Sequence, residues 1–111
     1  MKLIDIVEKL QLKVFSNGDA LKDIDVSGGY TSDLLSDVMG NAKEGQVWIT
    51  LQNHNNVMAV ASLNDLAAVI LVKGITPEDG FLKRSIEEGV PVLGTNLESF
   101  EMSGELYRLL R

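Results

Sequence analysis

Hydrophobic residues recur along this chain with two different spacings. Within the first ten residues, Leu3, Ile6, Val7 and Leu10 follow helical spacing, and Ile4 flanks them, which predicts an amphipathic helix packed on a core. Beyond residue 30, helical patterns alternate with short runs that are apolar almost throughout. Such runs are typical of strands covered on both faces. The expected helices are 31–41, 55–63, 76–88 and 95–110, and the expected strands are 46–51, 67–72 and 90–93.

The segment between these two parts is less regular. Residues 12–15 predict a short extended run, and 16–19 have the composition of a turn. Residues 21–26 alternate between apolar and polar, which indicates a half-exposed strand in part of this segment, ended by Gly28 and Gly29. We expect this N-terminal region to add shorter or edge strands.

Three strand-then-helix units in succession imply parallel strands joined by helical crossovers. We therefore predict an α/β fold, a three-layer α/β/α sandwich with a mostly parallel sheet. With 111 residues the chain suits a single domain over 1–111.

Composition excludes several classes of site. The chain has no cysteine and one histidine, which excludes thiol nucleophiles, zinc-thiolate sites and any site that needs two histidines. Ten Lys and Arg against 16 Asp and Glu give a net charge of −6, which opposes general nucleic-acid binding. Charges interrupt the N-terminal apolar residues, so no signal-peptide core forms. The apolar run 66–72 is far below the ~20 residues that span a bilayer, and we expect a cytoplasmic protein without membrane contact.

Ligands of open α/β sheets bind beyond the carboxyl ends of the strands, near helix N-termini. Four loops satisfy that rule here: 27–33, 50–56, 72–76 and 94–96. The candidate ligand-binding residues in these loops are Gly28, Gly29, Thr50, Gln52, Asn53, His54, Asn55, Lys73, Gly74 and Thr95.

The segment 52–56 is the most unusual of these loops, because all five side chains are amides or imidazole. They donate and accept hydrogen bonds without a fixed charge, as a cradle for a nucleotide, a sugar or a small anion would require. Helix N-capping by Asn55 or Asn56 explains the same composition, and both interpretations stay open. Gly28 with Gly29 fits either a close approach to phosphate or an ordinary turn. Lys73 before Gly74 fits either an anion contact or a solvated lysine.

Other chemistry-bearing residues favour structural roles. His54 lacks an identifiable second metal ligand, and Asp33 is the nearest candidate to orient it as a base. Asp33 and Asp37 fit the first turn of a helix better than a metal pair. No metal or cofactor is expected. The expected core residues here are Trp48, Phe100, Tyr107, Met39, Met58 and Met102.

Five ordered blocks, 33–39, 48–50, 57–61, 67–71 and 89–93, resemble a DRTGG domain, most closely the short stand-alone clostridial type. The resemblance covers roughly 26–110. The Asp-Arg pair of the family motif would fall within 52–54. Its Thr-Gly-Gly triplet would fall on 72–74, where only Gly74 matches.

The resemblance implies an α/β sandwich similar to the N-terminal domain of HPr kinase/phosphorylase, without its kinase site. Such domains occur beside CBS domains in regulated pyrophosphatases and beside acetyl-transfer enzymes, are regarded as regulatory or assembly modules, and are often dimeric. The family has no assigned catalytic residues.

Three functions are therefore compared. The first is a non-catalytic regulatory domain, a homodimer that senses a small anionic metabolite or nucleotide at the strand-end loops. The second is a ligand-free interaction module for a larger partner enzyme, with Leu3, Ile4, Tyr107 and Leu110 on its docking face. The third is a small enzyme that uses His54.

Overall fold

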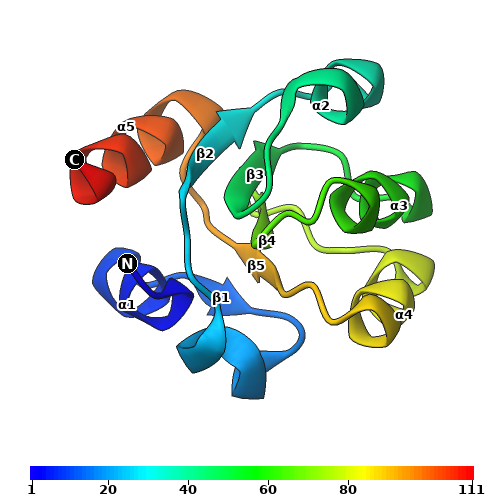
Figure 1. The fold of residues 1–111 in the computed structure, drawn as a ribbon, viewed down its shortest axis with the longest axis horizontal. Helices are drawn as coiled ribbons and strands as arrows, with labels where there is room; N and C mark the ends of the chain where they lie inside the picture. The colour runs from blue at the N-terminus through cyan, green and yellow to red at the C-terminus, as the bar shows by residue number, and fades with distance from the viewer.

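Five strands form one sheet at the centre of the protein (Figure 1). The computed structural model describes all of residues 1–111. The strands lie in the spatial order β1-β5-β4-β3-β2, so β1 and β2 are the two edges. Strands β2 to β5 run parallel, and β1 is antiparallel to β5. The strands are β1 (Lys13–Val14), β2 (Gly28–Thr31), β3 (Gln46–Thr50), β4 (Ala68–Leu71) and β5 (Val92–Gly94).

Helices cover both faces of this sheet, which confirms the expected three-layer α/β/α sandwich (Figure 1). Helices α2, α3 and α4 share one face, because they connect strands that step in a single direction across the sheet. Helices α1 and α5 cover the other face. None of the helices is long and apolar enough to cross a membrane. The helices are α1 (Leu3–Leu10), the 3₁₀ helix η1 (Gly18–Asp23), α2 (Leu35–Asn41), α3 (Asn55–Leu63), α4 (Asp79–Glu88) and α5 (Ser99–Leu110).

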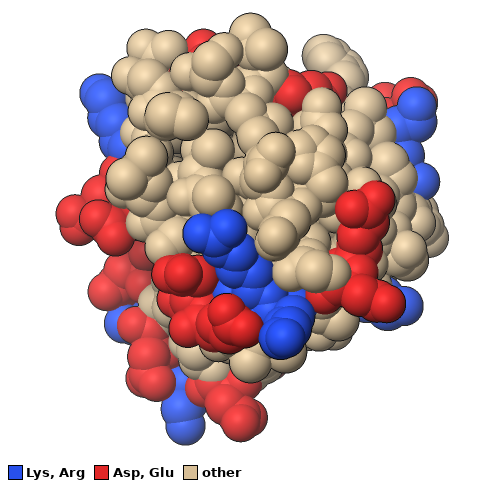
Figure 2. Space-filling view, turned by 90° about the vertical axis from the view of Figure 1, so that its right-hand side faces the viewer, with Lys and Arg blue, Asp and Glu red and all other residues tan.

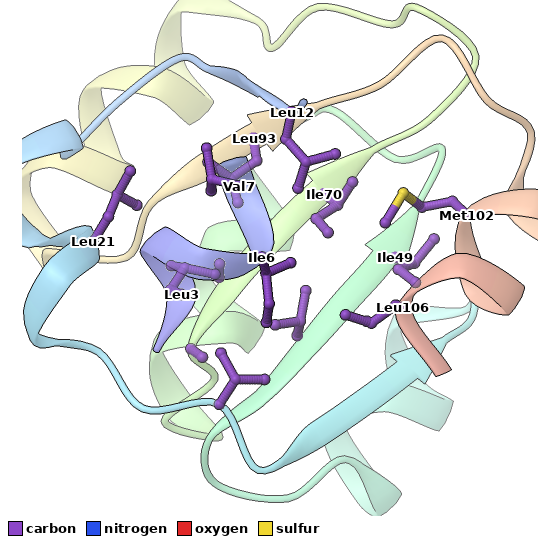
Figure 3. Packing of buried hydrophobic residues seen from close by; sticks show 14 of the residues in the cluster. Leu3, Ile6, Val7, Leu12, Leu21, Ile49, Ile70, Leu93, Met102 and Leu106 are labelled. Atoms are coloured by element: carbon purple, nitrogen blue, oxygen red, sulfur yellow. The ribbon is translucent and has the colours of Figure 1, made fainter. Parts of the chain in front are cut away.

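The core consists of one apolar cluster on each face of the sheet. The cluster beneath α1 and α5 contains Ile49 and Met102, and Figure 3 shows these side chains converging with those of α1. The cluster beneath α2, α3 and α4 contains Trp48 and Phe81. Neighbouring residues of a strand point to opposite faces, so Trp48 and Ile49 serve different clusters. This two-sided burial is the reason why β4 and the central residues of β3, 47–49, are apolar.

The structure corrects the expected elements between residues 18 and 31. Residues 18–23 form the 3₁₀ helix η1, and only Leu21 of this helix is buried. Gly28 and Gly29, expected to end a strand, instead begin β2, which pairs with β3 from Gly28↔Gln46 onward. A Cβ on Gly29 would lie 2.9 Å from Cδ2 of Leu106. A side chain at this position would therefore displace the buried Leu106 side chain, because α5 lies directly on this strand.

Several helices begin later than expected. Helix α2 begins at Leu35, since residues up to Thr31 belong to β2. Helix α5 begins at Ser99, because Thr95 and Leu97 accept hydrogen bonds from the loop after β4. The end of α4 at Gly89 is confirmed, and this residue has the left-handed φ of +73°.

Of the six residues predicted to lie in the core, three are buried and three are exposed. Trp48, Met58 and Met102 are fully buried, as expected. The expectation was wrong for three residues: Met39 is 48% exposed, Tyr107 69% and Phe100 85%. Helical spacing shows that residues share a face, but not that another element covers it. Of the expected docking residues, Leu3 is fully buried, because α1 packs that side chain on the sheet.

Candidate functional site

The loops after β4 and β5 leave the sheet toward opposite faces. The first leads to α4 and the second to α5, which lie in different layers (Figure 1). Since β4 and β5 are parallel neighbours, this divergence opens a crevice at their carboxyl ends. It is the topological switch point of the sheet, where ligands of such folds bind.

A cavity of about 430 Å³ occupies this switch point. Two backbone hydrogen bonds join the diverging loops beside it: Lys73 N donates to Leu97 O at 2.8 Å, and Gly74 N donates to Thr95 O at 2.9 Å. Lys73 and Gly74 both have left-handed φ angles, +60° and +71°. The lining residues are Leu10, Gln11, Lys13, Phe15, Gly74, Ile75, Thr76, Gly94, Thr95, Asn96 and Leu97.

The chemistry of this lining differs from the rest of the chain. Although the protein has 16 Asp and Glu residues, none of them lines the cavity. Its one charged residue is Lys13, whose Nζ lies 5.0 Å from the ring centroid of Phe15. Hydroxyl and amide side chains supply the remaining polar groups. The arrangement suits a ligand with an anionic group and a flat or apolar part.

Phe15 reaches the cavity because Gly94 has no side chain. A Cβ on Gly94 would lie 2.6 Å from Cε2 of Phe15, closer than real Cβ atoms approach. The antiparallel pairing of β1 with β5 brings this ring and Lys13 to the carboxyl end of the sheet. Sequence reasoning missed both residues, since nothing local to 12–15 shows which strand they pair with.

Asp33 organises the neighbouring β3–α3 loop. Its Oδ1 accepts hydrogen bonds from Thr50 Oγ1 at 2.9 Å and from Leu51 N at 2.8 Å. Gln52 Nε2 donates to the backbone oxygen of Asp33 at 3.0 Å. Asp33 lies before α2 rather than within it, so it shares no helix face with Asp37. Thr50 is fully buried.

Asn53 ties this loop to the cavity wall. Its Nδ2 donates to Thr76 O at 2.8 Å, and its backbone oxygen accepts from Glu78 N at 3.2 Å. Thr76 lines the cavity, so this hydrogen bond from Asn53 holds one part of the cavity wall in place. His54 occupies the N-cap position of α3 without a side-chain capping bond, and Asn55 is the exposed first residue of that helix.

The structure thus brings together only part of the expected site. Gly74 and Thr95 line the cavity. Lys73 lines an adjoining hollow of about 270 Å³ that also contains Glu98 and Glu101. Gly28 and Gly29 lie elsewhere: they pair with the first residues of β3, at the amino end of the parallel strands, and line a groove beside α5.

The pKa values of two side chains, Tyr30 and Asp37, are shifted, and both residues lie in the β2–α2 region. Hydrogen bonds from Ser32 and Tyr30 hold the pKa of Asp37 below its usual range, with a further contribution from Asn41. Desolvation and the neighbouring Asp37 raise the pKa of Tyr30. The Tyr30 hydroxyl donates to Asp37 Oδ2 at 2.9 Å. No group of three or more His, Asp or Glu side chains is placed to hold a metal ion.

Comparisons with known proteins agree with this architecture. A family model described as the DRTGG domain matches residues 5–109. The structure is similar to that of the CBS and DRTGG domains of the regulatory region of Clostridium perfringens pyrophosphatase, solved with the activator diadenosine tetraphosphate. The TM-score is 0.71 at 16% identity, over 95% of this chain and 45% of that one. This chain therefore spans less than half of that structure. Comparison with curated protein sequences gave no match.

Proposed function

Because the chain belongs to the DRTGG domain family, we propose that it is a non-catalytic regulatory domain that binds a small anionic metabolite or nucleotide. The proposed binding site is the cavity at the switch point of the sheet. The observation that carries the proposal is the carboxylate-free lining of this cavity, with Lys13 as its one charge, in a chain of net charge −6.

The size and position of the cavity support ligand binding. Its volume of about 430 Å³ falls within the range of ~300–1,000 Å³ common for small-molecule sites. Lys13 suits a phosphate or carboxylate group, and Phe15 offers an aromatic edge to a base. The similar clostridial regulatory region was solved with diadenosine tetraphosphate, which makes a nucleotide polyphosphate the first ligand to test.

The positions of the titratable side chains support a role without catalysis. A general base needs a partner that orients it. The bonds from the Asp33 carboxylate go to Thr50 and Leu51, so this residue is not the orienting partner expected for His54. A pH-dependent activity that His54→Ala abolishes would contradict this part of the proposal.

A thermal-shift measurement tests the site. The probes are diadenosine tetraphosphate, ATP, AMP, coenzyme A and acetyl phosphate, at concentrations up to millimolar. A ligand present at 100 times its Kd stabilises the folded state by ~2.7 kcal/mol. For a domain of this size, that corresponds to a rise in Tm of about 10 °C. A screen without any shift overturns the proposal.

Matched variants then locate the bound ligand. Lys13→Ala should weaken binding about tenfold or more, because it removes the one cation of the cavity. Lys43→Ala, at the opposite end of the sheet before β3, should leave affinity unchanged. Asn53→Ala should weaken binding through Thr76, whereas His54→Ala should not. Equal effects of Lys13→Ala and Lys43→Ala would place the ligand elsewhere.

A second candidate function is an assembly module for a larger enzyme. Helices α2 and α3 contain a single charged residue, Asp37, and Figure 2 shows the face over them almost free of charge. Leu63 is 68% exposed on this face. If the face docks a partner enzyme, Leu63→Glu should abolish co-purification of that enzyme, whereas Ile86→Glu on α4 should not. The absence of any co-purifying enzyme would count against this function.

We also propose that the protein is a cytoplasmic homodimer. The apolar groove beside α5 supports self-association, because it lies on the surface and contains no acidic side chain.

A further inference from the structure

The outer edge of β2 is open. This strand is the last in the sheet order, so its backbone groups on the outer side have no strand to pair with. Natural proteins protect such edges with charged side chains, prolines or covering elements. The residues of β2 are Gly28, Gly29, Tyr30 and Thr31, which include neither a charge nor a proline.

An apolar groove of about 640 Å³ runs beside this edge, between β2 and α5. Ile49 and Leu106 contribute to its lining, together with the exposed rings of Phe100 and Tyr107. Figure 1 shows α5 alongside β2 at this end of the sheet. Of the 16 acidic residues in the chain, none lines the groove.

Helix α5 presents two different apolar faces. Met102 and Leu106 are buried against the sheet. Phe100, Gly104 and Tyr107 follow at spacings of four and three and therefore form a second stripe on the helix surface. The two aromatic residues of this stripe are 85% and 69% exposed, so the stripe faces water in the isolated chain.

Gly104 has no explanation within the chain. A glycine in the interior of a helix costs roughly 0.5–1 kcal/mol relative to alanine. A Cβ at this position would meet no atom within 4 Å, so the folded chain has room for a larger residue here. The bare backbone between two exposed rings instead allows another molecule to approach the helix closely.

From these observations we infer that a second copy of this chain covers the open edge and the stripe. Two β2 strands pair antiparallel across a two-fold axis, which extends the sheet from one copy into the other. The two α5 helices then lie side by side, with Phe100 and Tyr107 of each copy packed over Gly104 of the other. This inference deepens the homodimer of the proposed function by assigning its interface.

Symmetry and charge favour a second copy as the occupant. An open edge requires an extended strand, and a two-fold axis perpendicular to the sheet supplies the identical strand with hydrogen-bonding groups in register. The same axis keeps both α5 helices on one face. Two chains of net charge −6 repel each other least where they meet through a groove that no acidic side chain lines and whose one charged side chain is that of Arg111.

The area that a stable dimer needs explains why the helix must take part. A specific interface buries about 800 Å² on each partner. The four residues of β2 are too few to provide this area, whereas the two aromatic side chains of α5 add large apolar surfaces of the type that dominates binding energy.

Glycine variants separate an interface role from a structural one. Gly104→Glu adds a charge to the stripe at a position where the monomer has room. Gly40→Glu is the matched control, a helical glycine of α2 whose Cβ also meets no atom within 4 Å. We expect sedimentation equilibrium to show a dimer for the wild type and for Gly40→Glu. Gly104→Glu should raise the dimer Kd by about 30-fold or more.

Cysteine cross-linking tests the geometry. The chain has no cysteine of its own, so a single introduced thiol can pair only with its copy. Gly104→Cys should form a disulfide-linked dimer on mild oxidation, because the two-fold axis brings the two positions together. Gly40→Cys should remain monomeric under denaturing, non-reducing conditions. Equal cross-linking of the two variants overturns the assigned interface.

These outcomes are independent of ligand binding. A wild type that is monomeric at all concentrations, or a dimer that Gly104→Glu leaves intact, overturns the interface even if nucleotides raise the Tm. Conversely, a flat ligand screen with a dimer that Gly104→Glu dissociates overturns the ligand site and leaves the interface standing.

Discussion

Asp37 links strand β2 to helix α2 through its side chain. Its two oxygens accept the Tyr30 hydroxyl at 3.0 and 2.9 Å, and Oδ1 also accepts from Asn41 Nδ2 at 3.1 Å. Hydrogen bonding by Ser32, together with that by Tyr30 and Asn41, favours the charged carboxylate and lowers the pKa of Asp37 below 3.8 in the folded protein. The bonds thus hold the edge strand to the helix that follows it.

The lowered pKa of Asp37 predicts a pH-dependent contribution to stability. A carboxylate with a depressed folded pKa stabilises the protein above its unfolded pKa, near 3.8, and loses this contribution as pH falls through the folded value. We therefore expect Asp37→Asn to be more destabilising at pH 7 than at pH 3. Urea unfolding, followed by the fluorescence of the single, fully buried Trp48, measures the free energy of unfolding of the wild type and the variant at each pH.

Tyr30→Phe provides the complementary variant, since it removes a hydroxyl that lowers this pKa. It should also destabilise more at pH 7 than at pH 3. If Asp37→Asn lowers the free energy of unfolding by the same amount at both pH values, the hydrogen bonds to the charged carboxylate do not stabilise the folded protein.

At the scale of elements, glycines mark both required and dispensable positions. Gly89 ends α4 with a φ of +73°, a conformation that side chains other than glycine adopt at a cost. Gly40 lies inside α2, where a Cβ has open space and the φ angle is not positive. The same substitution should therefore have opposite effects at these two positions.

We predict that Gly89→Ala destabilises the protein by ~1 kcal/mol, whereas Gly40→Ala stabilises it by up to ~1 kcal/mol. For a domain of this size each kcal/mol shifts Tm by about 4 °C or more. Thermal unfolding followed by circular dichroism measures both variants against the wild type. A Gly89→Ala variant as stable as the wild type would show that α4 ends in another way.

For the whole molecule, charge is distributed unevenly. On the face drawn in Figure 2, acidic and basic side chains gather away from the region over α2 and α3. Both the cavity at the switch point and the groove beside α5 lack acidic residues, although the net charge is −6. Binding at these two places should therefore respond to salt for different reasons.

We predict opposite salt dependences for the two proposed interactions. Raising NaCl from 50 to 500 mM shortens the screening length from more than 10 Å to less than 8 Å. This screening reduces repulsion between two acidic chains, so the dimer Kd should fall. The same screening weakens attraction between Lys13 and an anion, so the ligand Kd should rise. Sedimentation equilibrium and ligand titration measure the two constants, and a dimer that dissociates with salt would indicate an interface held by ion pairs.

Local spacing was sufficient to predict the layers of this fold. Helix α3 has the bounds expected from its pattern, and α4 ends at Gly89 as expected. The parallel strands were recognisable because burial on both faces makes β4 apolar at every position and β3 apolar at its three central positions, 47–49. These properties depend on neighbours within one element, which is the information that residue spacing carries.

The sequence by itself thus determined the fold class, the buried strands and three of the four predicted loops at the carboxyl edge, whereas most of the fourth, 27–33, belongs to strand β2. Only the tertiary structure decided that Lys13 and Phe15 complete the cavity, because β1 pairs with β5 from the far end of the chain. It also decided that Gly28 lies in an open edge strand and that Phe100 faces water. Strand order and the coverage of a helix face depend on contacts between distant segments, and the spacing of residues within one segment carries no record of them.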